Sequence, residues 1–104
     1  PITRLGLVHF RGEDETFVTE CAHGFHQYLA PHLPPGVQMH DPVPSPIARK
    51  KDEFYFQILF TVKQMPVFSR FLRKGLRHYS RYLRKRYPRS RIRIYVDIDP
   101  TSLI

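Results

Sequence analysis

Residues 54–62 read Phe-Tyr-Phe-Gln-Ile-Leu-Phe-Thr-Val, the clearest strand pattern in the chain. Every second residue, from Phe54 to Val62, is apolar, whereas the positions between them include Gln57 and Thr61. Alternation with a period of two indicates a β-strand with one apolar face. We therefore expect this segment to form a strand whose apolar side packs on a hydrophobic core.

The segments on either side of this strand extend the pattern. Residues 4–11, 37–40 and 91–97 also have strand character. Between them, residues 17–29 and 67–86 place apolar side chains three and four positions apart, which indicates amphipathic helices, and prolines follow each of them. The predicted order is therefore β-α-β-β-α-β.

Two β-α-β halves most simply build a ferredoxin-like α+β fold, in which two helices cover one face of a four-stranded antiparallel sheet. A chain of 104 residues has the length of a single domain, which we assign to residues 1–104. Residues 42–51 carry prolines at alternate positions and end in Arg-Lys-Lys. Because proline lacks an N–H group, we expect a Pro-rich basic connector between the second and third strands.

The net charge of +8 is concentrated in one stretch. Residues 63–93 contain twelve of the seventeen Lys and Arg residues and no acid. Like charges three or four positions apart destabilise a helix, and a polyanion would relieve that repulsion. Arginine also binds two phosphate oxygens at once. We therefore expect nucleic-acid phosphates to be bound by ten residues: Arg70, Arg73, Lys74, Arg77, Arg81, Arg84, Lys85, Arg89, Arg91 and Arg93.

The sheet face away from the helices is a second candidate surface. Tyr55, Gln57, Arg91, Arg93 and Tyr95 should point there. In single-strand binders of similar topology, aromatic side chains of a sheet stack on bases. Packing on a neighbouring domain would use the same residues, so both alternatives stay open.

Metal and catalytic sites are not expected. The single cysteine, Cys21, excludes an internal disulfide and a zinc site built on thiolates, and it falls on the apolar side of its helix. The six histidines lack ligand spacing with a supporting carboxylate, and Asp97 and Asp99 fit turn chemistry better than metal binding. No apolar run approaches the roughly 20 residues that span a bilayer, so we expect a cytosolic protein. The start at Pro1 without Met suggests a fragment of a longer one, although removal of an initiator Met before Pro would leave the same start.

Three segments carry a family resemblance: Asp-Pro-Val-Pro-Ser-Pro-Ile-Ala-Arg at 41–49, Phe-Tyr-Phe-Gln-Ile-Leu at 54–59, and Asp-Ile-Asp-Pro-Thr-Ser-Leu-Ile at 97–104. They resemble the C-terminal domain of the replication-restart helicase PriA, or primosomal protein N′. The resemblance implies a fold similar to a small-subunit ribosomal protein. It also implies a non-catalytic fragment of an ATP-dependent 3'-5' DNA helicase, whose ATP and zinc sites lie upstream, so no cofactor is expected here.

The same resemblance implies partners and a location. They are forked, branched or duplex DNA, the helicase core of the same chain, other primosome proteins, and single-stranded DNA-binding protein, in the bacterial cytoplasm at the nucleoid. The acidic tail of that last protein ends in Phe, so its site should combine cations with a small apolar pocket. We expect it around Arg70, Arg73 and Arg77, beside Phe71 or Tyr79. The alternatives are a ribosomal-type RNA-binding module and, less favoured because of the acids after Gly12, a small ferredoxin-like enzyme for anionic substrates.

Overall fold

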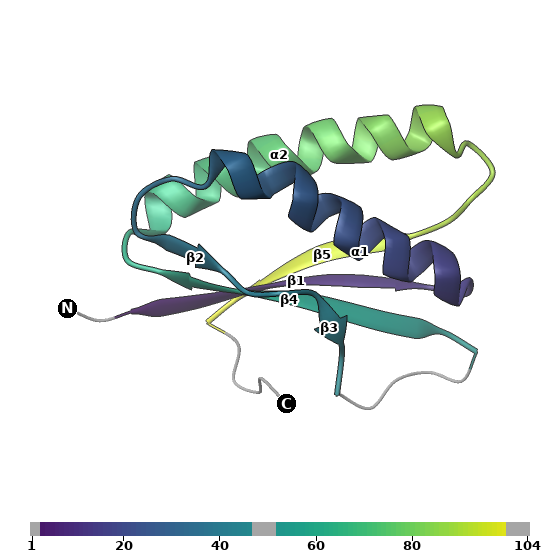
Figure 1. The fold of residues 1–104 in the computed structure, drawn as a ribbon, viewed down its shortest axis with the longest axis horizontal. Coiled ribbons are helices and arrows are strands. Elements are labelled where there is room, and N and C mark those ends of the chain that lie inside the picture. Colours follow the sequence, from purple (N-terminus) through teal and green to yellow (C-terminus); the bar gives the residue numbers. More distant parts are fainter. Residues whose placement is uncertain (1–2, 47–51, 100–104) are drawn as a thin grey trace.

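The computed structural model describes residues 3–46 and 52–99, which form one antiparallel sheet with both long helices on the same face (Figure 1). The strand order is β2-β4-β1-β5, and a short strand, β3, also pairs with β4. The predicted α+β arrangement is confirmed. The elements are β1 (Arg4–Gly12), α1 (Glu15–Leu29), η1 (Ala30–His32), β2 (Val37–Met39), β3 (Val43–Pro44), β4 (Phe54–Val62), α2 (Met65–Arg86) and β5 (Arg93–Ile98).

The two central strands, β1 and β4, pair along their full length, from Arg4 opposite Val62 to Gly12 opposite Phe54. The alternation in β4 has the predicted consequence. Ile58, Phe60 and Val62 are fully buried on the helix side, together with Val8 and Phe10 of β1. The apolar layer between sheet and helices is therefore built mainly on the two middle strands.

The sheet has five strands instead of the four predicted, because part of the Pro-rich connector pairs with β4. Val43 lies opposite Gln57, and the Ser45 N–H donates to the Tyr55 carbonyl at 2.9 Å. Prolines at alternate positions leave the intervening N–H groups free to bond to β4, so this sequence can form a short edge strand. The basic end of the connector, residues 47–51, lies outside the described residues.

The first helix, α1, begins at Glu15, two residues before its predicted start. The Asp14 carboxylate accepts a hydrogen bond from the Phe17 N–H at 3.0 Å and caps α1. Gly24 does not interrupt the helix, and it faces the Tyr79 side chain of α2. A Cβ atom at position 24 would sit only 2.5 Å from the hydroxyl of Tyr79.

The second helix begins at Met65, two residues before the predicted start, with Pro66 in its first turn. Its apolar stripe faces the sheet and α1, and Gly75 in that stripe allows Leu29 of α1 to pack directly against the helix backbone. The buried residues of the stripe are Phe68, Leu72, Gly75, Tyr79 and Leu83. In the part of the chain that the structure describes, neither helix is long and apolar enough to cross a membrane.

Candidate nucleic-acid interface

All ten cations predicted to bind phosphate are exposed to solvent. Seven lie on α2, on the side opposite its buried stripe, because the two sets are offset by about half a turn along the sequence. Arg89 and Arg91 follow in the loop after α2, and Arg93 begins β5. Among residues 3–46 and 52–99, no acid forms an ion pair with any of the ten.

The seven residues on α2 form what we call the basic face: Arg70, Arg73, Lys74, Arg77, Arg81, Arg84 and Lys85. At 1.5 Å per residue, the span from Arg70 to Lys85 is about 22 Å. Cations in the last turn suit the negative end of the helix dipole, whereas the first turn contains no acid. The basic face therefore runs along most of α2 on the side away from its buried stripe. Figure 1 shows that α2 and α1 lie together on one face of the sheet.

Near the C-terminal end of α2, a hollow of about 1110 Å³ is lined by side chains of both charges. Arg84, Arg89, Arg91 and Arg93 line it together with the carboxylates of Glu13, Asp14 and Glu53. Because these acids would repel a phosphate group, the outer side of α2 is better suited to a polyanion than the hollow is.

Glu53 has a structural partner on the sheet. Its carboxylate accepts a hydrogen bond from the Arg11 guanidinium at 2.8 Å, and this bond raises the pKa of Arg11. The same guanidinium lies 5.3 Å from the centre of the Tyr55 ring. Arg11, a central sheet residue, is therefore neutralised locally and adds little to the basic face.

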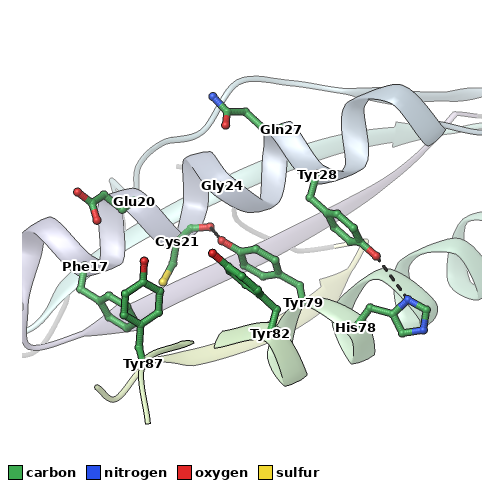
Figure 2. Close-up of a pocket in the computed structure, with 10 residues that line it drawn as sticks. All are labelled: Phe17, Glu20, Cys21, Gly24, Gln27, Tyr28, His78, Tyr79, Tyr82 and Tyr87. Atoms are coloured by element: carbon green, nitrogen blue, oxygen red, sulfur yellow. Dashed lines mark hydrogen bonds between the residues drawn. The ribbon is translucent and has the colours of Figure 1, made fainter. Parts of the chain in front are cut away.

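An aromatic groove of about 570 Å³ separates the two helices. Figure 2 shows its tyrosine rings gathered against α1 near Cys21 and Gly24. The Tyr79 ring stacks between those of Tyr28 and Tyr82, with centroids 6.0 Å apart in both pairs. The residues lining the groove are Phe17, Glu20, Cys21, Gly24, Gln27, Tyr28, His78, Tyr79, Tyr82 and Tyr87.

The floor of the aromatic groove is fixed and its rim is accessible. The Tyr79 hydroxyl donates to the Cys21 carbonyl at 2.9 Å, and burial raises the pKa of Tyr79. Burial also raises the pKa of the Cys21 thiol to about 12, as expected for an unreactive core cysteine. In contrast, Tyr82 is 52% exposed. The groove thus offers apolar surface directly beside a basic helix.

Of the residues predicted to bind protein, Tyr79 lines this groove and the other four do not. Arg70, Arg73 and Arg77 lie on the basic face, whereas Phe71 is half-buried and packs against the core. Sequence reasoning missed the aromatic groove because Tyr82 and Tyr79 both fall on the apolar side of the helical pattern. Only the close approach of α1 at Gly24 distinguishes the floor of the groove from its rim.

The face of the sheet away from the helices carries Tyr55, Gln57, Arg93 and Tyr95, as the strand register requires. Arg91 precedes β5, so it lies outside the strands of the sheet. Tyr95 uses one side of its ring to stack on His9, with centroids 4.7 Å apart. Since Arg11 also covers Tyr55, both tyrosines already have partners within the domain.

The two aspartates near the end of β5 have structural partners as well. Asp99 accepts hydrogen bonds from the Arg4 guanidinium and the Leu5 N–H, and the bond from Arg4 lowers the pKa of Asp99. Asp97 lies 4.0 Å from the His9 imidazole, whose pKa is lowered by burial. Across the described residues, no three His, Cys, Asp or Glu side chains come together in a group that could hold a metal ion.

A family model described as the primosomal protein N C-terminal domain matches residues 1–101. Among curated proteins, the comparison gave no match. Two designed proteins share the fold: Foldit4 (TM-score 0.59, 11% identity, covering 92% of this chain and 97% of that one) and LFR1 1, which has a ferredoxin fold (TM-score 0.59, 15% identity, 98% and 91%). A hydantoinase/carbamoylase family amidase from Burkholderia ambifaria is also similar (TM-score 0.54, 12% identity), with 97% of this chain covering 29% of that one.

Proposed function

Since this chain belongs to the family of primosomal protein N C-terminal domains, we propose that it is a non-catalytic DNA-binding domain acting in primosomal replication restart. The basic face of α2 binds phosphates of forked or branched DNA. Catalysis, ATP and zinc belong to other parts of the full helicase, in the bacterial cytoplasm at the nucleoid. The helicase core and other primosome proteins are its further partners.

One observation carries this proposal: the basic face presents seven exposed cations that no acid in the described residues neutralises. Pairs of oppositely charged side chains along the helix would have stabilised it. The unpaired positive charge is therefore better explained by an external polyanion. If five of the cations each neutralise one phosphate of a duplex, log K against log salt has a slope of about −4.5. Contacts of this kind carry no base information directly, which suits a domain that recognises the shape of a fork.

The test is fluorescence anisotropy with labelled forked DNA, linear duplex, single strand and structured RNA, each across a salt series. In the first variant, Arg73, Arg77 and Arg81 are all changed to Gln, which lowers the net charge by three. The matched control also lowers the net charge by three, but away from α2. It introduces three negative charges at exposed positions, as Thr3→Glu, Thr16→Glu and Gln38→Glu.

We expect the α2 variant to lose about 2.7 from the magnitude of the duplex salt slope, at 0.9 per phosphate contact. The control should retain most of the slope. Equal losses in both variants would mean that only net charge matters and would contradict an interface on α2. Tighter binding of structured RNA than of forked DNA would favour the ribosomal-type RNA-binding alternative.

We further propose that the domain contacts the acidic tail of single-stranded DNA-binding protein. The aromatic groove supports this finer proposal, because it places the exposed ring of Tyr82 next to Arg81 and Lys85 of the basic face. A terminal Phe would enter the groove while acidic residues meet these cations. In this placement, Arg70, Arg73 and Arg77 do not contact the tail, and they contribute to its binding only by attracting its acidic residues from a distance.

A labelled acidic peptide ending in Phe tests this placement, with the same peptide ending in Ser as the ligand control. Tyr82→Ala should weaken binding of the Phe peptide at least five-fold. Tyr95→Ala, which removes an exposed tyrosine outside the groove, should leave it unchanged. Equal binding of the Phe and Ser peptides would rule out the groove as the Phe pocket without affecting the DNA proposal.

A further inference from the structure

The two edges of the sheet are protected differently. On one edge, β2 and β3 are only three and two residues long, and the segment from Asp41 to Pro46 contains three prolines. Short edge strands and prolines prevent another strand from pairing. The opposite edge is β5, which runs for six residues from Arg93 to Ile98 without proline. Among residues 3–46 and 52–99, the β5 edge is therefore the one open to pairing with a further strand.

The backbone groups that β5 offers can be identified from its pairing with β1. The Asp99 N–H donates to the Leu5 carbonyl at 2.7 Å, so odd-numbered residues direct their backbone groups toward β1. In an antiparallel ladder the direction alternates from one residue to the next. The N–H and C=O groups of Ile94, Val96 and Ile98 consequently point away from the sheet and are available to another strand.

The side chains along this edge are unusually apolar for an exposed strand. Val96 is 37% exposed and Ile98 39%, although both lie on the helix side of the sheet, where apolar residues are normally covered. On the other side, Tyr95 is 39% exposed. The β5 edge thus combines free backbone groups with accessible apolar side chains, which is the combination that promotes strand addition.

We propose that β5 pairs with β5 of a second copy of this chain, antiparallel and centred on Tyr95. In this register, Arg93 lies opposite Asp97 of the second copy, and Asp97 lies opposite its Arg93. Ile94 lies opposite Val96 in the same way. The strand is therefore complementary to itself in charge and in apolar side chains, and a two-fold axis at Tyr95 joins the two sheets into one.

The hydrogen-bond pattern fits this register. Ile94 and Val96 form the hydrogen-bonded pairs, because their backbone groups point outward. Tyr95 meets its own copy in a non-hydrogen-bonded pair, and so does Arg93 with Asp97. Side chains are closest in pairs of this kind, so rings and opposite charges come into contact.

The association is expected to be weak and reversible. One added strand pair covers less surface than the interfaces of stable complexes, and each copy carries a charge of +8. It uses none of the basic face, and Arg93 is the only one of the ten predicted phosphate-binding cations that takes part. It is independent of the DNA proposal. In a joined sheet both α2 helices lie on the same side, so the dimer presents two basic faces in one direction.

Sedimentation velocity over a concentration series, with the 104-residue chain at physiological ionic strength, measures the monomer–dimer equilibrium. Arg93→Asp and Asp97→Arg should each reduce self-association at least ten-fold, because each creates two like-charged pairs across the axis. Mixing the two variants should restore a dimer, since every pair in the mixed species is then opposite in charge. The double variant, Arg93→Asp with Asp97→Arg, should also dimerise like the parent.

Val96→Pro is an independent test of the backbone. It removes an N–H that points away from the sheet, so the domain should fold, as circular dichroism would show, yet fail to dimerise. Three results would overturn the proposal: a monomeric parent at every concentration, a parent dimer that Val96→Pro leaves intact, or a mixture of the two charge variants that stays monomeric.

Discussion

Gly24 and Tyr79 provide a direct test of how the two helices pack. A Cβ atom at position 24 would lie 2.5 Å from the Tyr79 hydroxyl oxygen but 3.6 Å from the ring carbon that carries it. In an open helix, Gly→Ala stabilises by about 1 kcal/mol. Here Gly24→Ala forces the hydroxyl aside, which costs about 2 kcal/mol of overpacking. It also costs about 1 kcal/mol for the hydrogen bond to Cys21.

We therefore expect Gly24→Ala to lower the free energy of unfolding by about 2 kcal/mol. The sign should reverse in a Tyr79→Phe background, because without the hydroxyl the nearest atom is at ordinary contact distance. There the same substitution should stabilise by about 0.5–1 kcal/mol. Tyr79→Phe alone should cost about 1 kcal/mol. The two sites are thus predicted to be coupled by about 2.5–3 kcal/mol.

Urea denaturation followed by far-UV circular dichroism measures all four proteins of this cycle, since the chain has no Trp to report by fluorescence. A loss of 2 kcal/mol should move the midpoint by about 1 M. If Gly24→Ala has the same effect with and without the Tyr79 hydroxyl, this would contradict the placement of that hydroxyl against Gly24. Stabilisation in both backgrounds would likewise show that α2 is farther from α1.

Three further predictions concern single side chains. Arg77→Glu should stabilise the domain by about 1 kcal/mol, because Arg73, Lys74 and Arg81 then face an opposite charge. It should also weaken duplex binding more than Arg77→Gln does, as thermal melts and anisotropy would show. Burial lowers the pKa of His9 in the folded protein. As the pH falls, His9 therefore binds a proton in the unfolded chain before it does so in the folded chain. Stability should fall as the pH drops below about 6.5 and level off below the folded-state pKa, and His9→Gln should flatten this dependence in urea titrations at several pH values. Cys21, with a pKa of about 12, should react with iodoacetamide only at the rate of unfolding, and rapid labelling of the folded protein would contradict its burial.

The features that could be predicted from the sequence are those encoded locally. Two patterns depend on neighbours within one element: the alternation in residues 54–62 and the separation of apolar from basic residues around α2. For this reason β4 and the exposed basic face were predictable. The strand at Val43–Pro44 was not, because its existence depends on the free edge of β4 rather than on its own propensity. The aromatic groove also escaped prediction, since helical spacing places Tyr79 and Tyr82 on the same side. Packing against α1, at Gly24 and Phe25, buries Tyr79, whereas Tyr82 stays exposed.

Under the proposed function, α2 gives up stability for DNA binding. Each like-charged neighbour on the basic face costs a few tenths of a kcal/mol, and the helix contains no acid to offset them. The buried stripe from Phe68 to Leu83 provides the compensating stability, because it anchors the helix to both the sheet and α1. A helix held by its apolar side can keep its other side unneutralised until a polyanion arrives. The repulsion released at that moment adds to the binding free energy, so DNA should raise the melting temperature of the parent more than that of the Arg77→Glu variant.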